Sequence, residues 1–256
     1  MIRRGNWLFI TLFFCSNTFA YDIKPYLNQS PCEDEKLNLV FCSLNYQNKE
    51  DSLEDTKILI RRLKGTNPFD EFRNLGFWYI ALSKEEEREI FKPAPSFPPW
   101  QVPQGFINSI SKRIKSVYKL IIIDARGYVS CSELSSLAKT SLIMLGKARY
   151  KDENSFTKGF LHELGHSLGL RDESPQGEAM LCLPGPPNCA VTRQEAERLW
   201  GDLVGKDSRA NYISGCCGNK NYIRPTIASL MNDPDKAEDF GPVNERYLRH
   251  VLGIGP

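Results

Sequence analysis

The side chains best suited to chemistry lie in residues 160–172, F-L-H-E-L-G-H-S-L-G-L-R-D. His162 and His166 are four positions apart, so on a helix both imidazoles project from one face. Two imidazoles placed in this way can bind one metal ion, and Glu163 can reach a water on that ion as a general base. Only three histidines occur in the chain, and two of them stand in this motif. The pattern therefore predicts a zinc site with a base beside it.

A third ligand is expected shortly after the second histidine. Gly169 allows the chain to leave the helix in a conformation that other residues resist. The bend can bring back Asp172, whose carboxylate oxygen suits zinc. Glu195 and Glu197 in a downstream helix, and His250 near the C-terminus, are the alternative third ligands. The spacing of the glycine and the aspartate favours Asp172.

The motif needs a buried helix and a sheet to hold it. Phe156, Phe160, Leu164 and Leu168 continue a helical apolar spacing through the motif. Alternating or continuous apolar runs predict strands at 36–46, 76–82, 117–124 and 140–145, with 117–124 at the sheet centre. Helical spacing predicts further helices at 52–64, 106–114 and 192–203, and a last one that carries Tyr247, Leu248, Val251 and Leu252. Strands that alternate with helices indicate an α/β (α+β) fold.

Two other stretches are expected at the surface. The charged run 84–89, K-E-E-E-R-E, is interpreted as a solvated face. Residues 92–105 contain five prolines and are interpreted as an extended surface excursion. Neither is expected to divide the chain into separate domains.

The N-terminus has the features of a secretory signal peptide at residues 1–20. Arg3 and Arg4 precede an apolar run, and Thr18-Phe19-Ala20 places small residues where cleavage before Tyr21 requires them. There are two alternatives: an uncleaved anchor, for which the apolar run is too short to span a membrane, and attachment of a lipid at Cys15, which the bulky residues before it disfavour. Residues 21–35 are interpreted as an N-terminal tail or short pro-segment. We therefore expect an exported protein: secreted, periplasmic or at the cell surface.

Seven cysteines remain after the leader, so at least one is left without a partner within the chain: Cys32, Cys42, Cys131, Cys182, Cys189, Cys216 and Cys217. Cys182 and Cys189 flank the loop 183–187 and are expected to form a disulfide, and Cys32 could pair with Cys42. Whether Cys32 instead caps the metal in a latent form stays open. No C-x-x-C pair exists, which disfavours a second metal site.

The motif H-E-x-x-H-x-x-G-x-x-D resembles the signature of the metzincin metallopeptidases, in which a minority of families end the motif with Asp. Two such families are the IgA-peptidase-type and the snapalysin-type peptidases. The stretches N-P-F-D-E-F-R-N (67–74), R-P-T-I-A-S-L-M (224–231) and F-G-P-V-N-E (240–245) are similar to the IgA-peptidase-type family, whereas snapalysin-type chains are far shorter. Two features differ from that family: Asp172 is followed by Glu173-Ser174 rather than Glu-Tyr, and no tyrosine closely follows Met231.

The resemblance implies a metzincin-like catalytic domain over residues 36–256, with a mixed twisted sheet, an active-site helix and a Met-turn. Met231 would form the apolar floor of the metal site. The last strand, 140–145, would lie along the cleft edge and hold an extended peptide.

Together these patterns predict a secreted zinc-dependent metalloendopeptidase. His162, His166 and Asp172 would bind Zn2+ with water in the fourth place, and Glu163 would accept the proton of that water as it attacks the peptide. The alternatives are an exported zinc protein that binds peptides without cutting them, and an enzyme that processes cell-wall peptides. A net charge of +2 gives no reason to expect nucleic acid. We expect a peptide or protein substrate, no stable membrane insertion and a monomer.

Overall fold

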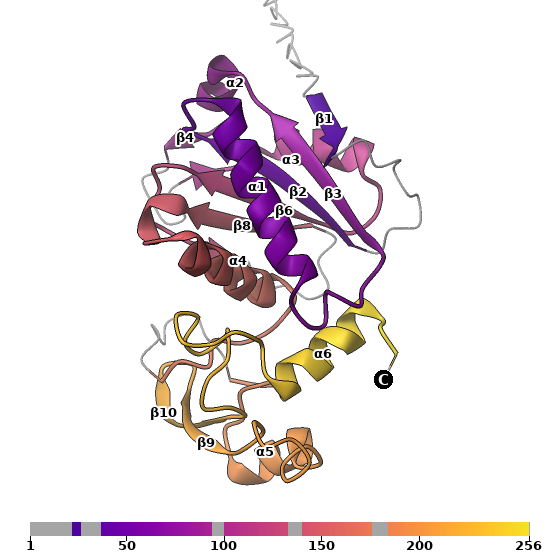
Figure 1. The fold of residues 1–256 in the computed structure, drawn as a ribbon, viewed down its shortest axis with the longest axis vertical. Coiled ribbons are helices and arrows are strands. Elements are labelled where there is room, and N and C mark those ends of the chain that lie inside the picture. The colour runs from indigo at the N-terminus through magenta and orange to yellow at the C-terminus, as the bar shows by residue number, and fades with distance from the viewer. Residues whose placement is uncertain (1–21, 27–36, 94–99, 133–139, 176–183, 256) are drawn as a thin grey trace, which may run out of the picture.

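The computed structural model describes residues 22–26, 37–93, 100–132, 140–175 and 184–255. The predicted signal peptide and Cys15, Cys32 and Cys182 lie outside these residues. The described chain forms a sheet with helices on both faces, followed by a C-terminal part below it in Figure 1. In the described residues no helix is both long and apolar enough to span a bilayer.

Four parallel strands make the centre of the sheet: β2 (Leu37–Leu44), β3 (Leu75–Ala81), β6 (Tyr118–Asp124) and β8 (Thr140–Gly146). Two short strands join them in antiparallel fashion, β1 (Asp22–Pro25) on β3 and β7 (Cys131–Ser132) on β8. The spatial order is β1-β3-β2-β6-β8-β7. The predicted α/β class with a mixed sheet is therefore confirmed, and the apolar run of β6 lies between β2 and β8 as expected.

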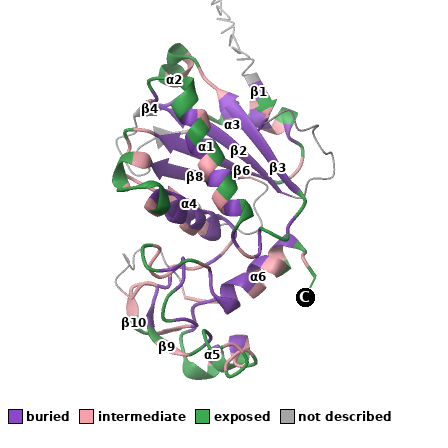
Figure 2. Ribbon diagram, viewed as in Figure 1, coloured by how far each residue is buried: buried purple, intermediate pink, exposed green. Residues whose placement is uncertain are grey.

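The strands are buried on both faces, which explains their nearly continuous apolar sequences. Alternate side chains such as Leu39 and Phe41 face α1 (Lys49–Lys64) and α4 (Glu153–Ser167). Their neighbours Val40 and Cys42 face the opposite way, toward α2 (Lys84–Ile90) and α3 (Gln104–Arg113). Figure 2 shows the resulting buried sheet between helices that are exposed on their outer sides.

Several expectations for the sheet region differ from the structure. The run 84–89 is exposed for the most part, but it is the helix α2, because Ser83 and Glu86 form a capping box at its start. The proline-rich excursion contains a pair of short antiparallel strands, β4 (Lys92–Pro93) and β5 (Trp100–Gln101). Residues 22–25, assigned to a tail from the sequence, form the edge strand β1.

The strand predicted at 140–145, which is β8, does not form the edge of the sheet, contrary to expectation. β7 pairs with its C-terminal half, with Cys131 opposite Met144 and Ser132 opposite Ile143. A two-residue strand has too few residues to show an alternation in the sequence, so the pattern gave no sign of it. β7 is therefore the strand that ends the sheet on the side of α4.

The C-terminal part is built from α5 (Arg193–Trp200), the hairpin β9 (Ile213–Cys216) and β10 (Asn219–Arg224), and α6 (Pro242–Leu252). A disulfide joins Cys189 to Cys216, so the predicted Cys182–Cys189 pairing is wrong. The suggested pairing of Cys42 with Cys32 is also wrong, because Cys42 is a free, buried thiol on β2. Burial raises the pKa of this thiol, which keeps it protonated and unreactive.

Candidate metal centre

Helix α4 carries the motif and is capped at its start. At its start the Asp152 carboxylate accepts a hydrogen bond from the backbone N–H of Ser155 at 2.7 Å. Phe156, Phe160 and Leu164 are buried in the core under the sheet. The helix therefore presents His162 and His166, both only partly buried, on the side away from that core.

The two histidine rings are oriented by backbone carbonyls from different segments. Nδ1 of His162 donates to the carbonyl oxygen of Leu230 at 2.7 Å, and Nδ1 of His166 donates to that of Leu170 at 2.9 Å. In a neutral imidazole the other nitrogen, Nε2, then carries a lone pair. The two Nε2 atoms face each other at 3.1 Å. Two lone pairs this close repel unless a cation lies beside both, so the donor set fits a metal ion.

Asp172 is brought to the same place by the predicted bend. Gly169 has a φ of 104°, a conformation that L side chains rarely adopt, and the Leu170 N–H donates back to the Gly165 carbonyl at 3.0 Å. The candidate ligand atoms of His162, His166 and Asp172 all lie within 4.8 Å of one another. The structure thus gathers the three residues singled out from the sequence, with the nitrogen and oxygen ligands that zinc prefers.

Glu163 lies beside this group in a nearly dry environment. Glu163 is only 6 % exposed. Burial raises the pKa of the Glu163 carboxyl, an effect opposed by the neighbouring His166 and Ser132 side chains and by Arg149. Burial likewise lowers the pKa of His162 and His166, which keeps both rings neutral and able to bind a cation.

Met231 packs against α4 at Gly165, the residue before His166. A Cβ placed on Gly165 would come within 2.6 Å of the Met231 sulfur, so the glycine in the motif is what allows this contact. Met231 is fully buried, and the preceding residue, Leu230, supplies the carbonyl that orients His162. The segment 226–231 therefore acts on the site through its packing and through its backbone.

Glu173 is a site residue whose role the sequence did not reveal. It is fully buried next to Asp172 and accepts four side-chain hydrogen bonds. Asn188 and Asn244 donate to Oε1 at 2.9 and 2.8 Å, and Ser229 and Thr226 donate to Oε2 at 2.7 and 3.2 Å. Its backbone N–H also donates to the Met231 carbonyl at 2.8 Å. One carboxylate therefore ties the ligand loop to the Met231 segment and to α6.

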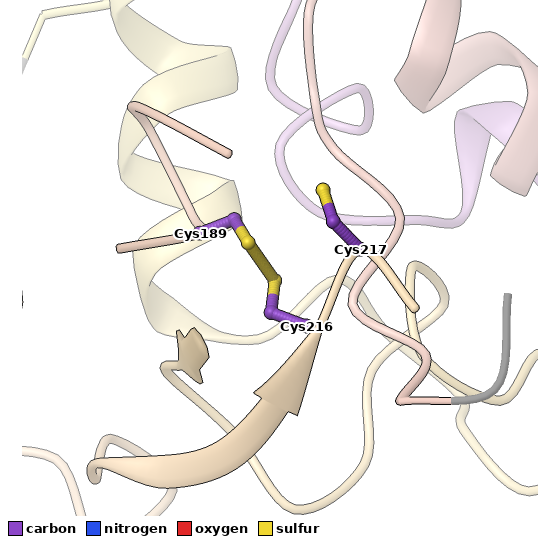
Figure 3. Close-up of side chains that lie close together, drawn as sticks. All are labelled: Cys189, Cys216 and Cys217. Carbon is purple, nitrogen blue, oxygen red and sulfur yellow. A yellow bond between two sulfur atoms is a disulfide. The ribbon is translucent and has the colours of Figure 1, made fainter. Parts of the chain in front are cut away.

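The disulfide-bonded hairpin holds the ligand loop from the other side. The backbone N–H of Cys217 donates to the Asp172 carbonyl at 2.9 Å, and that of Gly218 donates to the Ser174 carbonyl at 2.9 Å. Cys216 is bonded to Cys189, as Figure 3 shows, with Cys217 outside that bond. The sulfur atoms of Cys189, Cys216 and Cys217 lie close together, but all three cysteines are disulfide-bonded, so their sulfur atoms cannot ligate a metal.

The alternative third ligands lie elsewhere. Glu195 accepts a hydrogen bond from the backbone N–H of Val191 at the start of α5, and Glu197 pairs with Arg193 on the exposed face of that helix. His250 is exposed in the last turn of α6. Among the described residues, none of these side chains joins the histidine cluster.

Comparisons with known proteins add little to this geometry. No protein-family profile matches the chain, and no curated protein matches it. Among solved structures it is similar to an archaemetzincin from Methanopyrus kandleri, with 12% sequence identity, 88% of this chain and 99% of that chain covered, and a TM-score of 0.40. A TM-score of this size carries no argument, so the interpretation of the site rests on its own residues.

Proposed function

We propose that the protein is an exported zinc-dependent metalloendopeptidase. The observation that carries the proposal is the pair of Nε2 atoms facing each other at 3.1 Å, each imidazole fixed through Nδ1 by a backbone carbonyl. Asp172 completes a set of three ligands, which is typical of catalytic rather than structural zinc. The sequence resemblance to IgA-peptidase-type metzincins supports the same assignment, while the substrate of that family is not transferred to this chain.

The metal, when bound, supplies a Lewis acid that lowers the pKa of a water molecule and polarises the scissile carbonyl. Glu163 accepts a proton from the attacking water and delivers it to the amide nitrogen of the leaving group. Its burial raises the pKa of the carboxyl, which makes it a stronger base than an exposed glutamate. Asp172 and the two histidines only hold the ion.

The substrate is expected to be a peptide in extended form. β7 ends the sheet on the side of α4, and the Ser132 side chain lies next to the Glu163 carboxyl. A peptide running along this edge would bring a scissile bond close to the catalytic base. The disulfide between Cys189 and Cys216 suits an oxidising compartment, which supports export by the N-terminal leader.

The test compares the purified protein with two variants of α4. Glu163→Gln removes the base but keeps the size of the side chain, and Glu153→Gln makes the same change at an exposed position in the first turn of the helix. Zinc content is measured by mass spectrometry, and cleavage is followed with labelled casein with and without a chelator. We expect one zinc in all three proteins, with chelator-sensitive cleavage in the wild type and in Glu153→Gln only.

The outcomes separate the alternatives. Bound zinc with no cleavage by the wild type would favour a peptide-binding protein over a peptidase. Cleavage of muropeptides but not of casein would favour a cell-wall enzyme. Undiminished cleavage by Glu163→Gln would refute the role of the base, and a wild type that takes up no zinc would refute the metal site itself.

A further inference from the structure

A cavity lies at the C-terminal ends of β2 and β6, and none of the candidate metal ligands lines it. Its volume is about 490 Å3, and its walls include Tyr46, which follows β2, Phe91, which follows α2, and Arg126, which follows β6. The chain leaves β2 toward β3 on one side and leaves β6 toward β8 on the other. Adjacent parallel strands whose connections diverge leave a crevice at their carboxyl ends, where α/β proteins commonly bind ligands.

The cavity carries an excess of positive charge. Lys84 and Glu87 neutralise each other through an ion pair at 3.0 Å, and the Glu87 carboxylate also accepts from the Asn45 backbone N–H at 3.3 Å. Arg88 and Arg126 also line the cavity and are exposed. Within the described part of the chain, neither guanidinium lies within ion-pair distance of a carboxylate. Two arginines without acidic partners are suited to bidentate binding of oxyanions.

A smaller hollow of about 260 Å3 extends the cavity and shares Asn45 and Arg126 with it. Asn45 has a φ of 60°, and its Nδ2 donates to Asp124 Oδ1 at 2.8 Å, which fixes the floor between the two hollows. The smaller hollow is also lined by Tyr128, which is 73% exposed, and by Val129. We call the two hollows together the strand-end trough.

The strand-end trough leads toward the candidate catalytic base. Val129 lines it, and three positions further along the chain Ser132 lies in β7 beside Glu163. Three residues of extended chain span about 10 Å. A peptide that follows β7 therefore reaches the trough within a few residues of the bond to be cut.

We propose that the strand-end trough binds the carboxylate side chains of an acidic peptide segment, and that it selects substrates with such a segment several residues from the scissile bond. The selection of substrates rests on the proposed peptidase function, whereas the binding of the peptide does not. Arg88 and Arg126 bind the carboxylates, and Tyr46 and Phe91 form the apolar part of the cavity wall.

The test is direct binding in the absence of metal, so that cleavage plays no part. The probes are a fluorescein-labelled peptide of alternating glutamate and alanine and the same peptide with glutamine in place of glutamate, followed by fluorescence anisotropy. The variant is Arg88→Gln with Arg126→Gln. The control is Lys112→Gln with Arg113→Gln, which removes the same charge from the exposed last turn of α3.

We expect the wild type and the control to bind the glutamate peptide equally. The arginine variant should bind it at least about tenfold more weakly, since each charge-assisted contact contributes about that factor. The glutamine peptide should bind weakly to all three proteins. Equal binding of the two peptides, or wild-type affinity in the arginine variant, would overturn the proposal. Displacement of the peptide by an equal concentration of inorganic phosphate would also overturn it, in favour of a small-anion site.

The failure of this proposal can be told apart from the failure of the peptidase assignment. Glutamate-peptide binding by a protein that cleaves nothing would support the peptide site and refute its role in substrate selection. Cleavage of casein by a protein that does not bind the glutamate peptide would refute the trough and leave the peptidase assignment intact.

Discussion

Glu173 offers the sharpest test of how the metal centre is supported. Replacing it with alanine removes the acceptor of the Asn188, Asn244, Ser229 and Thr226 side chains in a fully buried place. The hydroxyls can rotate toward other acceptors, whereas each amide keeps one hydrogen without a partner. At about 1–3 kcal/mol for each buried polar group left unpaired, we expect a loss of about 4 kcal/mol in the free energy of unfolding.

This loss corresponds to a fall of about 8–16 °C in Tm for a chain of this size. Glu173→Gln keeps Oε1 as an acceptor, and the new amide can donate to the two hydroxyls, so we expect it to lose only about 1–2 kcal/mol. Zinc affinity should fall about tenfold or more in the alanine variant, because the Glu173 carboxylate ties the loop that carries Asp172 to Ser229 and Thr226 in the Met231 segment.

The assay combines thermal unfolding of the metal-free protein with competition for zinc against a chromophoric chelator. Glu54→Ala is the control, since this glutamate is exposed on α1 and forms a surface ion pair with Lys57. We expect the control to stay within about 0.5 kcal/mol of the wild type. An alanine variant at Glu173 with the Tm and zinc affinity of the control would refute the argument that this network supports the site.

Two further predictions concern the C-terminal part. Replacing both Cys189 and Cys216 with serine removes a disulfide whose sequence separation is 27, and should lower the free energy of unfolding by about 3–4 kcal/mol, measured by denaturant unfolding. Zinc binding, measured by chelator competition, should also weaken. Unchanged zinc affinity would contradict the argument that the disulfide-bonded hairpin supports Asp172. For Glu245, burial raises the pKa above the ordinary 4.5, an effect opposed by Arg209 and reinforced by Asp239 and Asp207. The stability it contributes is therefore present below the unfolded-state pKa and is lost as the pH rises through the folded-state pKa. In urea unfolding, Glu245→Gln should gain stability relative to the wild type as the pH rises from the ordinary 4.5 through the raised folded-state pKa of Glu245, and a difference that stays constant with pH would contradict this.

The helix of the metal site could be predicted because its information is local. The spacing of His162 and His166 and the position of Gly169 are properties of a few neighbouring residues, and the structure places all three in the expected arrangement. The strands β2, β6 and β8 were equally clear, because burial on both faces makes their sequences apolar throughout. The helix α2 was missed although its capping box, Ser83 and Glu86, was present in the sequence.

The hydrogen bonds and the disulfide that support the site could not be predicted, because the residues that form them are distant in the sequence. Glu173 and Asn244 are 71 positions apart, and no periodicity links them. The disulfide shows the same problem. The sequence favours pairing Cys189 with Cys182, the nearest cysteine along the chain, whereas the β9–β10 hairpin brings Cys216 to Cys189. The strand-end trough arises from the order of the strands, which the sequence alone did not give.

The geometry of the site implies that the metal centre and the C-terminal part are coupled. His162 is oriented by a carbonyl of the Met231 segment, and the Asp172 carbonyl is held by the hairpin that contains Cys216 and Cys217. His166 depends on the bend at Gly169, which leads directly into the same loop. The ligands therefore take up their positions only when residues after 172 have folded against α4. Because a metal bound by all three ligands stabilises only that folded arrangement, its binding free energy adds to the stability of the C-terminal part as well as to that of the helix.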